Sequence, residues 1–371
     1  MSSDGSPLGI YMLDVGQGDC TFIIPPVAAG EHEPAVAPIL FDCADAYVAE
    51  RFVANHEITR LSAVIASHLD LDHIRGLLPF LRGYFAAGNR VDRVFVALDR
   101  FAPQAADHNL RALVEQVLDW ADDPPHAGFS VEEPRTRDDD PLVVASGADW
   151  RVEVVLPSYA MRERQRLHGG RDPNRVSAVV RVNRAGKAVL IGGDAPLSAW
   201  EALPDEFVPA VALRTPHHGG NVVDDPDQWP AVASFYEKVS ADAAVVSVGT
   251  RNAYGHPVER HVDALAPAIR RVLCTQITPR CHQRPEDIRE DALRRAAGVE
   301  WPYRHRAERG HPSRRPNREV PCAGSVVACL RADGEIELEP GVAEHASIVD
   351  RALTPLCRPL AQDELSPTAR K

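Results

Sequence analysis

Short apolar runs that end in glycine, proline, aspartate or histidine recur along the chain, and we expect each run to form a β-strand. The expected strands cover residues 9–14, 20–24, 39–41, 61–66, 91–98, 150–156, 176–182, 188–191, 210–213, 243–248, 271–277, 325–330 and 335–338. Helical patterns cover residues 51–60, 74–81, 108–122 and 259–268. Two strand-rich halves with helices between them predict an α/β layered fold.

Residues 280–320 interrupt this pattern, because they are rich in arginine, proline and histidine and short of apolar runs. Residues 123–141 are rich in proline, aspartate and arginine, and we expect them to form an exposed connection. We predict one domain over residues 1–345, with an insertion at about 280–320, followed by a C-terminal tail over residues 346–371.

The composition is that of a globular protein, with 44% hydrophobic and 25% charged residues. The N-terminus lacks the pattern of a signal peptide, and no apolar stretch approaches the roughly 18 residues of a membrane span. Seven cysteines without a regular framework are typical of a reducing compartment, so we expect a cytoplasmic protein without a membrane partner. The net charge of −12 excludes a global cationic field for nucleic acid.

The segment His-Leu-Asp-Leu-Asp-His at residues 68–73 lies directly behind an expected buried strand. Alternate residues of an extended segment point the same way, so His68, Asp70 and Asp72 can converge while His73 turns in as a helix begins. Imidazole and carboxylate groups together suit zinc, manganese or iron. The alternative is a polar loop in which an aspartate caps the following helix.

Other polar residues also follow apolar strands, and the loops that carry them can meet at one edge of the fold. They are Asp14, Asp19, Asp42, Asp194, His217, His218 and His256. Each is a weak signal alone: Asp194 follows two glycines and could simply form a turn. His256 could either contact the start of a helix or act on a substrate, by binding phosphate or protonating a leaving group.

These motifs resemble, in chain order, the signature of the metallo-β-lactamase superfamily. The matching residues are Asp42, the 68–73 segment, Gly193-Asp194 and His217-His218-Gly219. The style is closest to the hydrolase domain of ComEC-type competence proteins, in the segments 13–19, 216–219 and 254–257 and in the aspartate at position 70. The resemblance covers roughly residues 8–277 and 324–340, and it implies a four-layer αββα sandwich with a metal site at one edge.

The resemblance implies two divalent metal ions, zinc or manganese. His68 and Asp70 would hold one ion, and Asp72 and His73 the other. Asp194 would bridge the two, and His217 would complete the second site. His218 is less favoured, because adjacent residues of an extended segment point oppositely. Two cations that share a carboxylate acidify water into hydroxide, and we expect Asp72 and His256 to be catalytic at this site. Asp42 would orient a ligand from behind.

One departure concerns the region between the metal motif and Asp194, where most of the superfamily supplies another histidine. This chain has Asp-Pro-Asn-Arg-Val-Ser at residues 172–177, and the nearby His168 lies between the expected elements beside two glycines. Oxygen ligands around the first metal would favour manganese over zinc.

A second candidate metal site flanks the insertion. Cys274, Cys281, His282 and Cys322 could bind a structural zinc if the ends of the insertion meet, although ordinary buried thiols are the alternative. Within the insertion Arg280 is followed by ten more arginines, which could form a local basic patch, a protein-docking surface or merely a solvated face. They are Arg284, Arg289, Arg294, Arg295, Arg304, Arg306, Arg309, Arg314, Arg315 and Arg318.

These features predict a metal-dependent hydrolase, with a phosphodiester of nucleic acid or a nucleotide as the leading substrate. A metallo-hydrolase of small esters, thioesters or lactams is the second reading, which the acidic net charge favours. A catalytically silent module of a larger assembly is the third.

Overall fold

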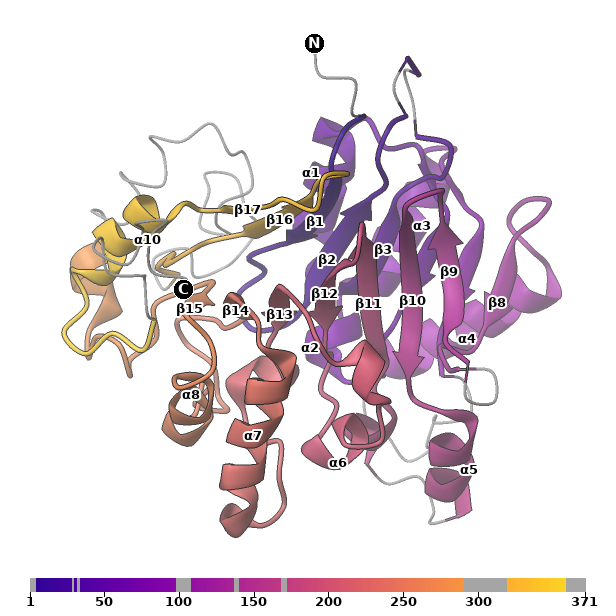
Figure 1. The fold of residues 1–371 in the computed structure, drawn as a ribbon. Coiled ribbons are helices and arrows are strands. Elements are labelled where there is room, and N and C mark those ends of the chain that lie inside the picture. The colour runs from indigo at the N-terminus through magenta and orange to yellow at the C-terminus, as the bar shows by residue number, and fades with distance from the viewer. Residues whose placement is uncertain are drawn as a thin grey trace.

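The computed structural model describes residues 5–28, 30–31, 34–97, 108–136, 140–167, 172–289 and 319–357. Within these residues two large β-sheets face each other, as Figure 1 shows. The first sheet has the strand order β17-β16-β1-β2-β3-β5-β7-β8 and the second has the order β15-β14-β13-β12-β11-β10-β9.

The strands of the first sheet are β1 (Leu8–Met12), β2 (Cys20–Ile24), β3 (Ile39–Cys43), β5 (Ala63–Ile65), β7 (Arg93–Phe95), β8 (Ser130–Glu132), β16 (Val326–Leu330) and β17 (Ile336–Glu339). Those of the second are β9 (Leu142–Ser146), β10 (Trp150–Leu156), β11 (Val179–Arg184), β12 (Lys187–Ile191), β13 (Ala212–Arg214), β14 (Ala243–Val246) and β15 (Arg271–Cys274). A small pair, β4 (Arg60–Leu61) and β6 (Arg90–Val91), lies apart from both sheets.

Alternation along each strand produces three apolar layers. Ile10 of β1 and Ile191 of β12 belong to one buried cluster between the sheets. Neighbouring positions point outwards, so Leu190 of β12 belongs to the cluster on the outer face of the second sheet. Because both faces of each sheet must be covered, helices are required on the two outer faces.

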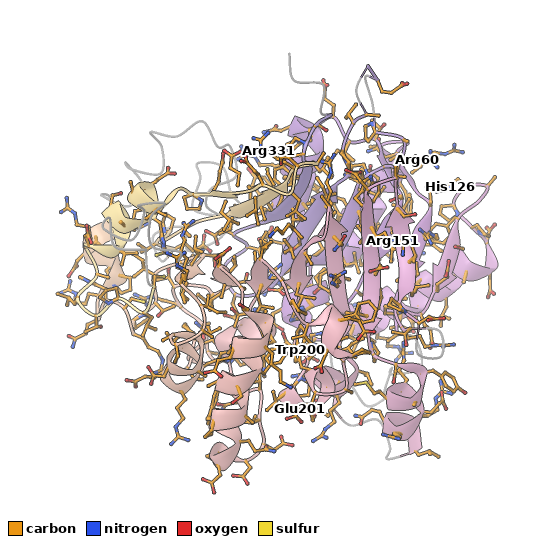
Figure 2. The ribbon with its side chains drawn as sticks, in the orientation of Figure 1. Arg60, His126, Arg151, Trp200, Glu201 and Arg331 are labelled. Carbon is orange, nitrogen blue, oxygen red and sulfur yellow. The ribbon has the colours of Figure 1, made fainter. Side chains whose placement is uncertain are left out.

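The helices meet this requirement. The first sheet is covered by α1 (Ala46–Asn55), α3 (Leu77–Ala86) and α4 (His108–Asp122). The second is covered by α6 (Leu197–Trp200), α7 (Trp229–Val239), α8 (Glu259–Leu265) and α10 (Val342–Val349). Two more helices, α2 (Leu71–Ile74) and α5 (Tyr159–Leu167), lie in the connections. On the second sheet Trp200 packs against Phe235, with 5.1 Å between ring centroids (Figure 2). The predicted four-layer αββα sandwich is confirmed.

Several elements differ from the sequence prediction. The connection expected at residues 123–141 contains β8, which pairs in parallel with β7 and is too short for a periodic signal. The helix expected at residues 74–81 is divided into α2 and α3. Gly76 lies between them, against the backbone of Asp45 and Ala46, where a Cβ would collide. Asp45 caps α1, whose expected range of 51–60 begins at Ala46 instead.

The C-terminal residues are part of this fold as far as they are described. Ile348, Val349 and Cys357 are buried in the outer cluster of the second sheet, although residues 346–371 were expected to form a tail. The insertion lies largely outside the described residues, as does His168. No helix among the described residues is both long and apolar enough to span a bilayer.

The direction of the strands determines where a site can form. In the first sheet β3, β5 and β7 are parallel, and in the second sheet β12, β13, β14 and β15 are parallel. The carboxyl ends of parallel strands share an edge, and ligands bind beyond such ends. The loops after β5, β12 and β13 therefore carry the candidate ligands to a common place between the sheets.

Candidate metal centre

The metal motif leaves β5 as a short buried loop and then starts α2. His68 and His73 are buried, whereas the Asp70 side chain is 47% exposed and Asp72 16%. Asp70 occupies the capping position of α2, yet its side chain makes no capping hydrogen bond. The capping alternative is therefore wrong for Asp70, whose Oδ2 lies 3.6 Å from Nε2 of His68.

Asp194, in the turn after β12, lies at the centre of the cluster. Its Oδ1 is 3.0 Å from Nε2 of His73, and its Oδ2 is 3.7 Å from Nε2 of His68. A Cβ at the preceding Gly193, whose φ is +48°, would collide with Oγ of Ser177. The glycine allows this tight turn, which places the two carboxylate oxygens towards different histidines.

His217 and His218 both reach the cluster, because the segment is not extended. It is a tight turn with φ of 54° and 52° at the two residues. Buried His218 lies with its Nε2 3.2 Å from Nε2 of His73 and 3.3 Å from Oδ2 of Asp72. His217 is partly exposed, with Nε2 3.7 Å from Oδ2 of Asp194. The structure thus places His218, rather than His217, among the residues of the expected second site.

Contacts with the residues behind His73 and His218 fix the orientation of the two imidazole rings. Asp42 is fully buried and accepts hydrogen bonds from the Ser67 backbone N–H (2.7 Å) and hydroxyl (2.8 Å); its Oδ2 lies 2.8 Å from Nδ1 of His73. The carbonyl of Ser247 lies 3.0 Å from Nδ1 of His218. With each Nδ1 bonded in this way, each Nε2 is directed into the cluster.

Ser177 stands in the region where the superfamily resemblance lacks a histidine. Its Oγ lies 3.2 Å from Nδ1 of His68 and accepts a 3.0 Å hydrogen bond from the backbone N–H of Asp194. Ser67 also contacts Nδ1 of His68, at 3.0 Å. Ser177 therefore positions two candidate ligands, His68 and Asp194.

We expect Asp42→Asn to weaken metal binding by about 10- to 100-fold, the usual effect of losing a carboxylate behind a ligating histidine. Asp42 has a φ of +56°, a conformation that asparagine tolerates, so the backbone should be retained. Competition with a chelator of known affinity would measure the change. Asp205→Asn, at an exposed position, is the control. Unchanged affinity in Asp42→Asn would contradict a positioning role.

The donor set fits divalent cations. Three overlapping groups have ligand atoms within 4.8 Å of one another: His68–His73–Asp194, Asp72–His73–His218, and Asp19–Asp42–His73. Among the described residues, buried Nε2 of His68 has no hydrogen-bond partner. Leaving buried polar atoms unpaired is costly, and coordination of a cation would remove that cost.

The electrostatic environment of the cluster also favours the binding of cations. Burial opposes protonation of His73, but the charges of Asp194 and Asp42 outweigh it and raise the pKa of His73 well above its usual value. Burial also opposes protonation of His218, yet Asp19 and Asp194 raise its pKa to about 10. Burial alone would raise the pKa of Asp194, but His73 and His218 lower it well below the ordinary value. The ionised carboxylates thus hold protons on the two histidines, where cations could bind.

We therefore expect metal binding near pH 7 to release protons from His73 and His218, and affinity to rise with pH by about tenfold per unit for each proton. Calorimetry in buffers of different ionisation enthalpy would measure the release. The same protons stabilise the metal-free fold fully below the ordinary histidine pKa of 6.5, and for His218 this contribution is lost as pH rises through about 10.

His108→Gln, at an exposed position, should leave the proton release unchanged, whereas His218→Gln should reduce it. Heats that are independent of the buffer in the wild-type protein would contradict this electrostatic description.

His256 lies beside the cluster. Its ring is 5.3 Å from that of His217 and 6.2 Å from that of His218, between centroids. Burial, followed by the two neighbouring histidines, lowers the pKa of His256 to about 4. The ring is therefore neutral near pH 7, which suits accepting a hydrogen bond and not protonating a leaving group.

Two further residues of the β1–β2 loop, Asp14 and Gln17, differ in their relation to the cluster. Asp14 does not join the cluster, because its Oδ1 accepts hydrogen bonds from the Gly16 N–H and the Gln276 side chain. Gln17, which the sequence interpretation did not select, donates from Nε2 to Oδ2 of Asp72 at 3.5 Å. A single glutamine in a turn carries no signal that could have identified it.

The group of potential ligands around Cys322 contains partly different residues from the cysteine site expected from the sequence. Cys322 lies with His345 and Cys357, whereas His282 belongs to no metal-binding group among the described residues. Cys274 donates its backbone N–H to Sγ of Cys357 at 3.2 Å. Of these partners, Cys357 comes from the expected tail and His345 from just before it, and both are brought to Cys322 because α10 folds back on the second sheet.

No known family profile matches the chain, and no curated protein matches it. Among solved structures it is similar to the metallo-β-lactamase fold protein YhfI from Bacillus subtilis, with 12% identity over 72% of this chain and 96% of that chain and a TM-score of 0.42. It is also similar to the short form of human tRNase Z, with 12% identity over 66% and 94% and a TM-score of 0.38.

A third similar structure is CmlA, a diiron β-hydroxylase from Streptomyces venezuelae. Identity is 16% over 71% of this chain and 51% of that chain, with a TM-score of 0.39.

Proposed function

We propose that this protein is a metal-dependent hydrolase of phosphodiesters, with nucleic acid or a nucleotide as substrate. The observation that carries the proposal is the buried convergence of His68, His73 and Asp194 at the carboxyl edge of the two sheets, with Nε2 of His68 left unpartnered. Buried groups whose environments strongly shift their pKa values are typical of functional sites.

Two divalent ions would share this centre. We assign His68, Asp70 and Asp194 to one ion, with His217 alongside, and Asp72, His73, His218 and Asp194 to the other. Mixed nitrogen and oxygen ligands suit zinc or manganese. Such a pair of ions, when bound, acidifies water and neutralises the charge that develops on a phosphoryl or acyl group.

The chain's own residues prepare the centre for this chemistry. Asp194 directs one carboxylate oxygen towards His73 and the other towards His68, so it can join the two ligand groups. Asp42 fixes the orientation of His73, and burial of this shell reduces reorganisation during the reaction. His256, neutral near pH 7, borders the route to the ligands and can accept a hydrogen bond from a substrate hydroxyl.

A cleft of about 340 Å³ beside His256 supports an anionic substrate. Its lining includes Arg251, Arg280 and Asn252, which can donate to phosphate oxygens. Arg251 also lies 3.6 Å from Glu286, so its charge is partly balanced. This pair of arginines supplies local positive charge in a chain whose net charge is −12.

A smaller neutral substrate is the second candidate. The acidic net charge and Glu286 in the cleft wall favour esters, thioesters or lactams over a long polyanion. The silent-module interpretation is less favoured, because an idle site would gain nothing from keeping three histidines and four aspartates convergent. The cluster consists of His68, His73, His218, Asp19, Asp42, Asp72 and Asp194.

The direct test is cleavage of end-labelled single- and double-stranded DNA with added manganese or zinc, comparing wild type with Asp72→Ala and with the exposed-site control Asp205→Ala. We expect metal-dependent cutting that only Asp72→Ala abolishes. Cleavage of a chromogenic ester or lactam, without any cleavage of DNA, dinucleotide or nucleotide phosphodiesters, would favour the second candidate. Full activity in Asp72→Ala would remove the proposed centre from the mechanism.

A further inference from the structure

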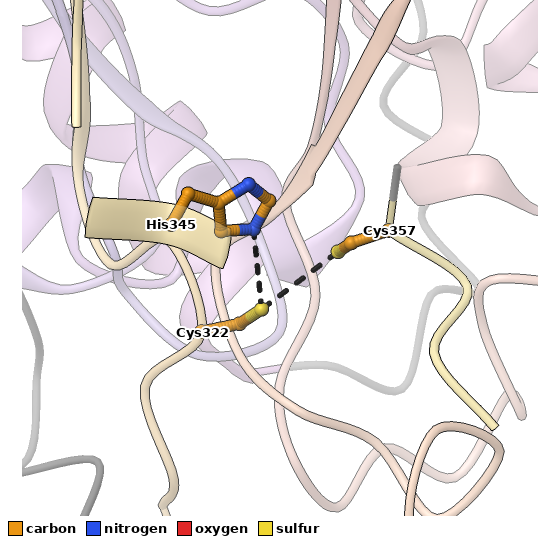
Figure 3. A group of neighbouring side chains, drawn as sticks. All are labelled: Cys322, His345 and Cys357. Atoms are coloured by element: carbon orange, nitrogen blue, oxygen red, sulfur yellow. Dashed lines mark hydrogen bonds between the residues drawn. The ribbon is translucent and has the colours of Figure 1, made fainter. Parts of the chain in front are cut away.

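A second group of potential ligands lies outside the His/Asp centre. Cys322, His345 and Cys357 are all buried, and their ligand atoms lie within 4.8 Å of one another (Figure 3). They come from the segment before β16, from α10 and from the C-terminal segment after α10. None of them contributes to the proposed hydrolytic site.

The distances between these ligand atoms match those around a tetrahedrally coordinated zinc ion. Ligand bonds of about 2.3 Å to sulfur and about 2.0 Å to imidazole nitrogen place two sulfurs about 3.8 Å apart, and sulfur and nitrogen about 3.5 Å apart. Sγ of Cys322 is 3.7 Å from Sγ of Cys357 and 3.4 Å from Nε2 of His345. Two edges of the tetrahedron are thus already formed by the side chains.

A fourth cysteine lies next to this group. Cys274, at the end of β15, is buried and donates its backbone N–H to Sγ of Cys357 at 3.2 Å. Backbone N–H groups that donate to sulfur stabilise metal thiolates. Cys274 is not among the three residues whose ligand atoms lie within 4.8 Å of one another, but its thiol interacts with that of Cys357, which makes it the candidate for a fourth ligand.

We propose that Cys322, His345 and Cys357, with Cys274 as the fourth ligand, bind a structural zinc ion. The ion joins the end of β15, the chain entering β16, α10 and the C-terminal segment. The two sides of the insertion already meet there, because Ile277 and Cys322 donate backbone hydrogen bonds to Val320 and Thr275. The zinc therefore fastens the C-terminal segment and the base of the insertion to the second sheet.

This arrangement is better explained by a metal than by ordinary apolar packing of thiols. His345 is completely buried, and its Nε2 faces Sγ of Cys322 at 3.4 Å. An imidazole buried among sulfurs gains little from hydrophobic contact, whereas zinc binds both ligand types. A fully protein-ligated ion without an open position is typical of a structural site.

Cobalt substitution of the full chain distinguishes the two centres, because only the cysteine group offers sulfur. We expect cobalt to give a thiolate charge-transfer band in the near ultraviolet and strong tetrahedral visible bands. Cys322→Ala and Cys357→Ala should lose the charge-transfer band, whereas Cys329→Ala should retain it. Cys329 is the matched control, since it is a partly buried cysteine on β16 outside the group.

Zinc content provides a second readout. We expect a protein with His68→Ala, His73→Ala and Asp194→Ala, which removes ligands of both ions of the hydrolytic site, to retain one zinc per chain, and additional Cys322→Ala to lose it. If the cysteine variants do not fold, the wild-type cobalt spectrum alone decides. Absence of a thiolate band would overturn the proposal, as would a Cys322–Cys357 disulfide in freshly purified protein that reduction does not convert to a metal-binding form. Hydrolytic activity enters neither readout, so this proposal can fail while the proposed function stands.

Discussion

Asp194→Asn is expected to lower metal-dependent hydrolysis by roughly 10³-fold, because loss of several kcal/mol of transition-state stabilisation corresponds to a decrease of that size. Asp194 is the only residue whose carboxylate oxygens approach His68, His73, His217 and His218 within the described part of the chain. The amide keeps the size of the side chain but removes its charge and one acceptor oxygen. Steady-state rates at saturating metal would measure the effect.

Two controls separate chemistry from folding in this experiment. Asp205→Asn should retain wild-type rates, since this residue is exposed and belongs to no group of potential ligands among the described residues. Circular dichroism should show that Asp194→Asn remains folded. A folded Asp194→Asn protein with at least one-tenth of the wild-type rate would exclude the bridging role.

Arg214→Met is expected to lower the free energy of unfolding by about 3–5 kcal/mol, the usual cost of removing one partner of a buried ion pair. Nη2 of Arg214 lies 2.6 Å from Oδ1 of Asp19, and both side chains are almost fully buried. Arg214 also bonds Thr21 on β2, so it connects the two sheets beneath the cluster. Urea unfolding in the presence of a chelator would measure the loss without a contribution from bound metal.

The matched control for this substitution is Arg60→Met, which breaks a 2.9 Å ion pair with Asp92 at the surface, where Figure 2 shows Arg60. Exposed pairs contribute about 0–1 kcal/mol, so this variant should unfold almost as the wild type does. Arg214→Met combined with Asp19→Leu should recover part of the lost stability, because the charge of Asp19 is then removed together with that of Arg214. Equal losses in Arg214→Met and Arg60→Met would show that the buried pair has no special role.

The sequence was most informative where local pattern and chemistry coincide. An apolar strand followed directly by His68, Asp70, Asp72 and His73 needs no distant partner to be recognised. Two strand-rich halves with helices between them likewise predicted an α/β layered fold, and the superfamily resemblance implied its four αββα layers. The superfamily resemblance then indicated that Asp194 belongs with the motif, although more than 100 positions separate them.

The tertiary structure decided how distant groups meet. A left-handed turn brings His218 to His73, whereas the superfamily resemblance implied His217 and the assumption of an extended segment disfavoured His218. The return of α10 onto the second sheet brings His345 and Cys357 to Cys322, which no spacing in the sequence could indicate. Local sequence determines which residues begin and end each strand, and which ligands lie close along the chain. Contacts between distant segments depend on the φ and ψ angles of a few turn residues and on packing of the layers, so only the folded chain determines them.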